Sequence, residues 1–423
     1  MVKNFLQNCK MNKKIFSWAL YDSANSVFFT TVMAGFFPLF FKKYWSGEVA
    51  AVVSTQRLGF VLAISGLLLA VLSPTLGVIS DKRRAKKKFL FSTMVLGALA
   101  TIGLYFVPQG DWSTAAILYG SALFLCSASC VFYDSLLTAV ATRDQYDFVS
   151  SLGYSMGYLG GGLVFLINVL MYLYPDWFGI SSDVQAIKIS FITVGVLWFL
   201  LTLPLMRNVP EPATKVSALG ISTLTKETFT ELGHTIKDIF ANKNLFYFVL
   251  AYWLYIDGIF TVMAMAVDFG LSLGLEPADL IKALLITQFV GFPSAYMFGV
   301  WASKWNNRNL ILVCLAIYAV TIVGASQMTT GTHFFMLATV IGLAQGGVQA
   351  LSRSLFAQLS PPEKSGEYFG FFNLLGKFAS IIGPAMIAFF AHFTGDSRKT
   401  ILSLLVLVGA GGFILLKVRK PTY

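Results

Sequence analysis

The sequence predicts an all-α membrane protein with twelve transmembrane helices in two pseudo-symmetric six-helix bundles. Three observations predict this fold class: the composition, the number of long apolar segments, and an internal repeat. Of the 423 residues, 56% are hydrophobic and only 12% are charged, whereas soluble domains have roughly 25% charged residues. Phe (39) and Gly (36) are abundant, as is typical of membrane proteins in which helices pack closely. This composition excludes an ordinary soluble globular protein.

Twelve apolar segments are long enough to cross a membrane as helices. A hydrocarbon layer ~30 Å thick needs ~20 helical residues. We expect spans at residues 16–41, 54–79, 89–107, 114–140, 149–174, 185–206, 245–270, 279–302, 309–327, 333–359, 367–393 and 400–416. They form two sets of six, which predicts an N-terminal bundle (1–206), a linker (207–244) and a C-terminal bundle (245–423).

The linker has a pattern of its own. From Thr223 to Ala241 apolar residues recur at largely helical spacing, and charged residues occupy the rest of the wheel. This pattern predicts an amphipathic helix that lies on the membrane surface and connects the bundles.

The charge distribution predicts the orientation. The net charge is +11, but the basic residues gather in short segments between the spans, so no nucleic-acid partner is expected. With the N-terminus inside, the inside segments hold 22 Lys and Arg residues, and the outside segments and span edges hold 6. The positive-inside rule therefore predicts that both termini are cytoplasmic.

The two halves of the sequence resemble each other. The segment WALYD (Trp18–Asp22) opens the first half and WLYID (Trp253–Asp257) opens the second. Aligning the Ser-Leu pairs of spans four and ten places Asp134 opposite Arg353. Duplicated six-helix halves are typical of transporters, whose sites lie near the midplane between the repeats.

Two cations interrupt the apolar pattern of spans ten and eleven, Arg353 and Lys377. A cation at membrane depth costs at least ~2.5–3.5 kcal/mol, so it is expected to face a cavity or a buried partner. We expect both to line a transport path and to contact an anionic group, most simply a carboxylate. For Arg353 there is an alternative, a gating ion pair with Asp134. Lys377 has no acidic counterpart in the aligned repeat and is the stronger candidate for contacting substrate.

Two carboxylates also lie inside spans, Asp257 and Asp22. Each is a candidate proton carrier, and the alternative for each is a static partner of a nearby cation. Three further polar side chains in spans, Tyr21, Tyr255 and Asn373, are candidate substrate contacts. Their alternative role is packing or hydrogen bonding between helices.

The loop after span two reads GVISDKRRAKKK and contains Gly77 and Asp81. It resembles the loop motif of the major facilitator superfamily, although Arg84 and Ala85 depart from it. The segments WALYDSANSVFFTTVMAGFFPLFF and GGVQALSRSLFAQLSPPEKSGEYFGFFNLLGKFAS are similar to the vacuole-effluxer-like branch, which is related to the fungal autophagy amino-acid effluxer. Many proteins of this branch carry Asn where this chain has Asp134. The resemblance implies that Asp81 belongs to a gating latch.

The residues and the resemblance together indicate a secondary active transporter that works by alternating access and is coupled to protons. The expected solute is an amino acid or another carboxylate or zwitterion; a lipid-like or phosphorylated solute and a non-transporting receptor or scaffold are the alternatives. A monomer in the bacterial cytoplasmic (inner) membrane, with no cofactor, is expected. An enzyme is not, because the three His residues lack metal-ligand spacing.

Overall fold

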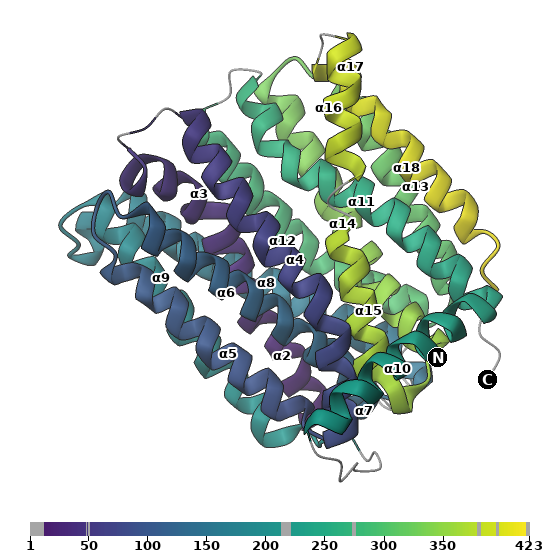
Figure 1. The fold of residues 1–423 in the computed structure, drawn as a ribbon. Coiled ribbons are helices and arrows are strands. Elements are labelled where there is room, and N and C mark those ends of the chain that lie inside the picture. Colours follow the sequence, from purple (N-terminus) through teal and green to yellow (C-terminus); the bar gives the residue numbers. More distant parts are fainter. Residues whose placement is uncertain are drawn as a thin grey trace.

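The computed structural model describes residues 12–47, 49, 51–212, 221–272, 276–378, 382–394 and 397–419. Within these ranges the regular secondary structure is helical (Figure 1), which confirms the predicted fold class. Ten of the described helices are long and apolar enough to cross a membrane.

The first six predicted spans are present in the N-terminal half. They are α2 (Lys13–Val27) continued by η1 (Phe28–Phe36), α3 (Phe37–Phe40) and η2 (Phe41–Trp45), then α4 (Ala51–Arg83), α5 (Lys86–Gly103) with η3 (Leu104–Phe106), α6 (Trp112–Ser135) with α7 (Leu137–Val140), α8 (Tyr146–Leu173) and α9 (Asp183–Asn208). The segments η1 and η2 are π-helical, a rare form that is often found at functional sites.

The C-terminal half holds the other predicted spans. They are α11 (Lys243–Ser272), α12 (Pro277–Ala302), α13 (Asn307–Ser326), α14 (Gly331–Leu359), α15 (Ser365–Phe378) with α16 (Ile382–Thr394), and α17 (Ser397–Thr400), η7 (Ile401–Ser403) and α18 (Leu404–Leu415). The described residues of the eleventh predicted span belong to α15 and α16. The twelfth contains the shorter apolar helix Ile401–Leu415.

Most helices begin a few residues before the apolar stretch that predicts them. In five of the described span helices the reason is a polar N-cap whose side chain accepts a hydrogen bond from a backbone N–H of the first turn. The caps are Asn12, Asp111, Ser182, Asn306 and Thr330.

Close packing of α2 on α8 follows from glycines in span five. An added Cβ on Gly157 would lie 2.8 Å from the Ser26 hydroxyl oxygen, and one on Gly160 would lie 2.4 Å from the Ser23 Cβ. The two helix backbones can approach this closely only because these positions have no side chain. The glycine ridge of span five is therefore a helix–helix interface.

The linker contains the predicted helix, α10 (Ile221–Ala241). It packs against α4 and α11. Figure 1 shows α10 at the same end of the molecule as both termini, and we call this end the termini face. The boundaries of the two bundles and the linker stay a prediction.

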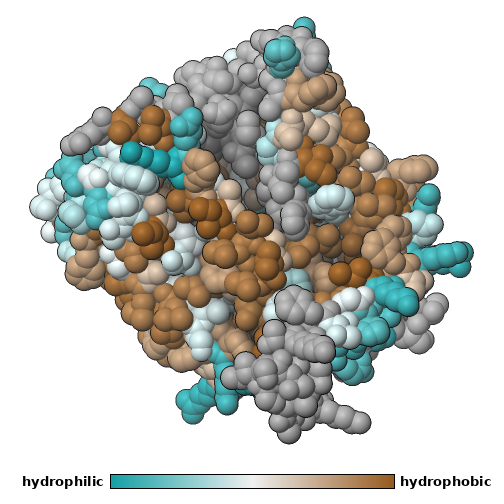
Figure 2. Space-filling view, in the orientation of Figure 1, coloured by the Kyte–Doolittle hydropathy of each residue, from teal (hydrophilic) through white to brown (hydrophobic). Residues whose placement is uncertain are grey.

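The surface suits a lipid environment. Figure 2 shows mostly hydrophobic residues across the middle of one face of the molecule and hydrophilic residues toward its edges. Large apolar side chains such as Phe60, Ile117 and Val320 are 68–70% exposed. A soluble protein rarely exposes so much apolar surface, so these residues face the hydrocarbon layer.

The two halves are hydrogen-bonded to each other near the termini face. The Ser73 hydroxyl donates to the carbonyl of Gly370, and the Ser155 hydroxyl donates to the carbonyl of Phe292. Ser155 lies nine residues into α8 and Ser73 ten residues before the end of α4, which places both ~15 Å from that face at 1.5 Å per residue. The structure therefore holds the two halves together over the half of the membrane nearer the termini face.

Candidate functional site

Arg353 is the centre of the polar interface between the halves. It lies on α14, is 1% exposed, and donates four hydrogen bonds. Nη1 bonds to Asp134 at 3.0 Å and Nη2 to Asp22 at 3.1 Å; Nε bonds to the Ser150 hydroxyl at 2.9 Å and Nη2 to the Ser150 carbonyl at 2.8 Å. A guanidinium has five N–H donors, so Arg353 is almost fully engaged by groups of the N-terminal half.

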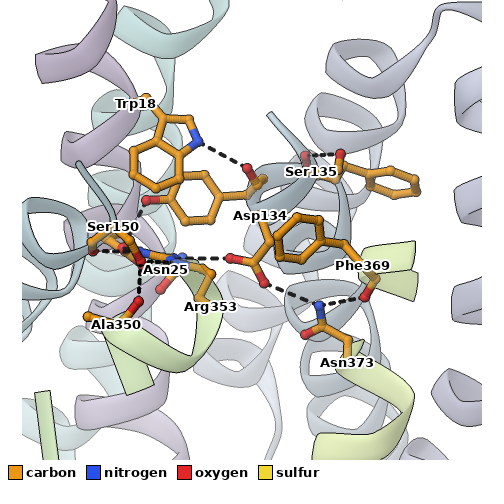
Figure 3. Close-up of polar contacts among 12 residues, drawn as sticks. Trp18, Asn25, Asp134, Ser135, Ser150, Ala350, Arg353, Phe369 and Asn373 are labelled. Carbon is orange, nitrogen blue, oxygen red and sulfur yellow. Dashed lines mark hydrogen bonds and ion pairs between the residues drawn. The ribbon is translucent and has the colours of Figure 1, made fainter. Parts of the chain in front are cut away.

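Both carboxylates have a further partner (Figure 3). The Tyr133 hydroxyl donates to Oδ2 of Asp22 at 2.8 Å. The Asn373 amide, on α15, donates to Oδ2 of Asp134 at 3.2 Å. We call Arg353, Asp22, Asp134, Tyr133, Ser150 and Asn373 the central network.

Aromatic rings enclose the guanidinium. Its carbon lies 4.3 Å from the ring centre of Tyr154 and 4.9 Å from that of Trp18. Trp18 stacks on Tyr133 at 4.5 Å and donates its indole N–H to the Tyr133 carbonyl. A cation between aromatic faces is stabilised after leaving water, which helps to keep Arg353 charged inside the protein.

Gly153 on α8 provides the space in which the network forms. A Cβ at this position would lie 2.5 Å from Oδ2 of Asp22 and 2.9 Å from both the Arg353 Nη2 and the Tyr133 hydroxyl. Ser150 lies three residues earlier on the same helix, which is close to one turn, so both positions face α14. The helix α8 thus contributes Ser150, which accepts hydrogen bonds from Arg353, and Gly153, which leaves room for the network because it has no side chain.

The charges of the central network do not cancel. Arg353 carries one positive charge, and Asp22 and Asp134 carry two negative charges when ionised, a formal sum of −1. A buried net charge is costly. A proton on either carboxylate, or a cationic group of a solute, would neutralise it.

Asp257 occupies a different site, inside the C-terminal half. Its oxygens accept hydrogen bonds from the backbone N–H groups of Ile382 and Gly383 at 3.1 and 2.9 Å, and from the Thr261 hydroxyl at 3.4 Å. The carboxylate therefore connects α11 to α16 through hydrogen bonds from the α16 backbone.

Asp81 lies at the termini face and links the halves. It forms an ion pair of 2.7 Å with Lys86 and accepts hydrogen bonds from the backbone N–H groups of Gly366 and Glu367. Lys86 also donates to the Ser365 hydroxyl at 2.7 Å. We call these contacts between α4, α5 and the start of α15 the first latch.

The helix α10 fastens the same region from outside. Glu231 forms an ion pair with Lys82 on α4 at 3.2 Å. The Thr235 hydroxyl donates to the buried carboxylate of Glu367 on α15. The helix α10 therefore binds Lys82, which follows Asp81 in the chain. It also binds Glu367, whose backbone N–H donates to Asp81.

The remaining predicted substrate contacts lie in several places. Tyr21 is fully buried and donates to the Ser129 hydroxyl within the N-terminal half. Tyr255 is fully buried and its hydroxyl pairs with that of Ser352 within the C-terminal half. Lys377 belongs to the last turn of α15, and its side chain lies outside the described part of the structure.

The structure therefore brings together four of the predicted site residues. Arg353, Asp134, Asp22 and Asn373 meet in the central network, and the contact between Arg353 and Asp134 is the one expected from the aligned repeat. Asp257 lies apart from them. Sequence reasoning did not identify Ser150 as a partner, because a serine in an apolar span gives no signal of its own.

Comparison with known proteins gives a family. The model of the family described as "Vacuole effluxer Atg22 like" matches residues 54–146 and 138–421. The chain is 36% identical over 415 residues to an uncharacterized MFS-type transporter, YxiO, of Bacillus subtilis (strain 168), covering 98% of this chain and 96% of that protein. It is 25% identical over 284 residues to autophagy-related protein 22-1 of Penicillium rubens, covering 62% of this chain and about half (47%) of the fungal protein.

Solved structures of the major facilitator superfamily share the fold. The proton:xylose symporter XylE bound to 6-bromo-6-deoxy-D-glucose superposes with a TM-score of 0.72 at 15% identity, over 96% of both chains. FucP in the outward conformation superposes with a TM-score of 0.71 at 10% identity, over 96% of this chain and 100% of that one. At these identities the likeness concerns the arrangement of helices alone.

Proposed function

The chain belongs to the Atg22-like vacuole effluxer family of the major facilitator superfamily, and on that premise we propose that this membrane transporter is a proton-coupled secondary transporter. It moves a small solute, an amino acid or another carboxylate or zwitterion, by alternating access. The proposed cycle rocks the two six-helix bundles, residues 1–206 and 245–423, about the central network.

One observation carries this proposal. A single buried guanidinium on the C-terminal half holds two carboxylates of the N-terminal half, Asp22 and Asp134, and the group has a formal charge of −1. Opening the interface on the termini face requires Arg353 to leave both carboxylates, which would strand buried charges at a cost of several kcal/mol. A proton and a charged solute remove that cost, and this links their binding to the movement of the bundles.

A zwitterion suits the network better than a simple anion. The solute carboxylate would take over N–H donors that Arg353 now gives to Asp22, since a guanidinium binds a carboxylate with its planar fork. The solute ammonium group would meet the carboxylate of Asp134 and the amide oxygen of Asn373. We retain Lys377, one turn after Asn373 in α15, as the second cation for the anionic end of the solute.

Asp22 is the proposed proton carrier of the central network. It shares Arg353 with Asp134 and accepts a hydrogen bond from Tyr133, so a proton on it leaves Arg353 free to bind a solute carboxylate. Asp257 is the second proposed carrier. Because its carboxylate accepts two backbone N–H groups of α16, we propose that it exchanges a proton when span eleven moves and these hydrogen bonds break.

The proposed orientation places the termini face in the cytoplasm of a bacterium, because the loops on that side carry most of the Lys and Arg residues. The first latch, with Asp81 and Lys86, then closes the cytoplasmic side. The contacts between the halves near the termini face support a state in which solute enters from the opposite face. Release into the cytoplasm, or uptake from it, requires the latch to open.

Two measurements in sequence test the proposal. A thermal-shift screen of the purified protein against amino acids and other carboxylates identifies the ligand, because a ligand at 100 times its Kd adds ~2.7 kcal/mol of stability. Proteoliposomes then measure the flux of that ligand with and without a pH gradient, and we expect the gradient to drive accumulation. Binding without flux would instead favour a receptor on a transporter fold, and flux indifferent to the gradient would reject proton coupling.

A further inference from the structure

We propose that Asp147, Asn307 and Ser354 form a second latch, which closes the interface on its α8 side just as the first latch closes it on its α4 side. The inference rests on the alternating access proposed above. It assigns a gating role to three residues that lie at the ends of their spans or next to Arg353.

The three side chains join the two halves at the termini face. Asp147 lies in the first turn of α8, and Asn307 is the first residue of α13. The Asn307 amide donates to Oδ1 of Asp147 and to the Ser354 hydroxyl, the latter at 2.8 Å, and the Ser354 hydroxyl also donates to Oδ1 of Asp147. Asn307 is 5% exposed and Ser354 is fully buried, so opening this side must break hydrogen bonds to a carboxylate.

The second latch has the same plan as the first. Lys86 is the first residue of α5 and Asn307 the first residue of α13, which are the third spans of the two halves. Each donates to a carboxylate and to a serine hydroxyl: Lys86 to Asp81 and Ser365, Asn307 to Asp147 and Ser354. The two donors thus occupy equivalent positions in the two halves.

The origin of the carboxylate differs between the two latches. The loops after spans two and eight correspond as Gly77-x-x-x-Asp81-Lys82 and Gly299-x-x-x-Ser303-Lys304, so the second copy of the loop has Ser303 in place of the acidic residue. The Ser303 hydroxyl bonds to the Val300 carbonyl of its own helix at 2.6 Å, and the residue is exposed. Asp147 supplies the carboxylate from the opposite half. Both latch carboxylates thus belong to the N-terminal half.

The glycines before the two loops support the same symmetry. A Cβ on Gly77 would lie 2.2 Å from the Gly366 carbonyl oxygen, and a Cβ on Gly299 would lie 2.6 Å from the Ser151 Cβ. Glycine therefore permits close contact across the interface at both equivalent positions. Each latch lies beside one of these close contacts.

The second latch is built on the helix turns that carry the central network. Ser354 follows Arg353 on α14, and Ser150 follows Asp147 by three residues on α8. Figure 3 shows Arg353 between Ser150 and Asp134. A proton or solute that changes the partners of Arg353 therefore acts directly on the turn that holds Ser354, and this connects the solute site to the gate.

The test measures the gate without any transport assay. Spin labels at Asp144 and Lys304, both exposed in loops beside the second latch, report its opening by double electron–electron resonance in nanodiscs. The four native cysteines are replaced in this background. A second pair at the exposed Arg83 and Glu363 reports the first latch.

Three variants decide the question. Asn307→Ala should raise the ratio of open to closed distances by about tenfold, equivalent to ~1.4 kcal/mol. Asn307→Lys should lower this ratio, because a lysine at this position can form an ion pair with Asp147, as Lys86 does with Asp81. The exchange Asp147→Asn with Asn307→Asp should restore the distribution of the parent protein, and Ser303→Ala is the matched control that should change nothing.

Some outcomes would overturn the inference. They are an unchanged distance distribution in both Asn307 variants, or a change in the Ser303 control as large as that of Asn307→Ala. If Asn307→Ala does not fold, Asn307→Lys still tests the inference, because it should lower the ratio of open to closed distances. The spin-label measurement uses no solute, so a negative result there would not reject proton-coupled flux. A negative flux assay would likewise leave the spin-label distances interpretable.

Discussion

Gly153→Ala is predicted to break the central network with a single methyl group. The added carbon would lie 2.5 Å from Oδ2 of Asp22 and 2.9 Å from the Arg353 Nη2 and the Tyr133 hydroxyl. Real carbon–oxygen contacts are not this short, so at least one of these polar groups must move. All three belong to buried side chains, and none can move into water.

The magnitude follows from the bonds that meet at this point. Oδ2 of Asp22 accepts two hydrogen bonds, from Tyr133 at 2.8 Å and from Arg353 at 3.1 Å. A hydrogen bond to a charged group contributes ~1.5–3 kcal/mol, and overpacking by a methyl group costs ~1–3 kcal/mol. The higher helix propensity of Ala offsets about 1 kcal/mol. With the loss of one of these hydrogen bonds, we expect a net loss of roughly 1.5–5 kcal/mol, the sum of these ranges.

The assay is equilibrium unfolding in mixed micelles, with two matched Gly→Ala controls. Gly66→Ala, where an added Cβ meets no atom within 4 Å, should be neutral or slightly stabilising. Gly157→Ala places its Cβ 2.8 Å from the Ser26 hydroxyl, 3.3 Å from the Asp22 carbonyl oxygen and 3.5 Å from the Asp22 Cβ, so it should destabilise without meeting the carboxylate of Asp22.

A double-mutant cycle separates the network from simple packing. Tyr133→Phe removes one of the atoms that the methyl group meets, so it should partly relieve the cost of Gly153→Ala and leave that of Gly157→Ala unchanged. The reasoning would be refuted if Gly153→Ala unfolds like Gly66→Ala, or if the two glycine variants couple equally to Tyr133→Phe.

Three other predictions concern residues outside the network. Asp257→Asn should reduce gradient-driven uptake at least tenfold while solute exchange persists; unchanged gradient-driven uptake would end its assignment as a proton carrier. Thr235→Val removes the donor to the buried Glu367 carboxylate and should cost ~1–3 kcal/mol, seen as a wider distance distribution between labels at Arg83 and Glu363; an unchanged distribution would show that α10 does not fasten the gate. Lys377→Ala should weaken ligand binding about tenfold in the thermal-shift assay, and unaltered affinity would remove Lys377 from the substrate site.

The spans could be predicted from hydropathy alone, because ~20 apolar residues in a row have one solution in a bilayer. The contact of Asp257 with span eleven could not. The apolar pattern of that span gives no sign that the backbone N–H groups of Ile382 and Gly383 donate to a carboxylate of another helix, α11. A tertiary hydrogen bond to a backbone N–H leaves no mark in a local sequence pattern.

The candidate site, too, could be predicted only in part from the sequence. The internal repeat predicted that Arg353 faces Asp134, but it gave Asp22 no partner, because Asp22 and Arg353 do not occupy equivalent positions in the two halves. The role of Gly153 as the space for the network follows only from the crossing of α8 with α2 and α14. Asp147 was missed because a carboxylate at the end of a span looks like a solvated charge.

The most direct test of the account is solute-driven proton movement in proteoliposomes, compared between the parent protein and Asp22→Asn. A pH-sensitive dye inside the vesicles records protons while labelled solute records transport. The account predicts that solute addition changes the internal pH with the parent protein, and that Asp22→Asn exchanges solute with no change of pH. Solute movement by the parent protein without protons, or undiminished proton movement in Asp22→Asn, would contradict it.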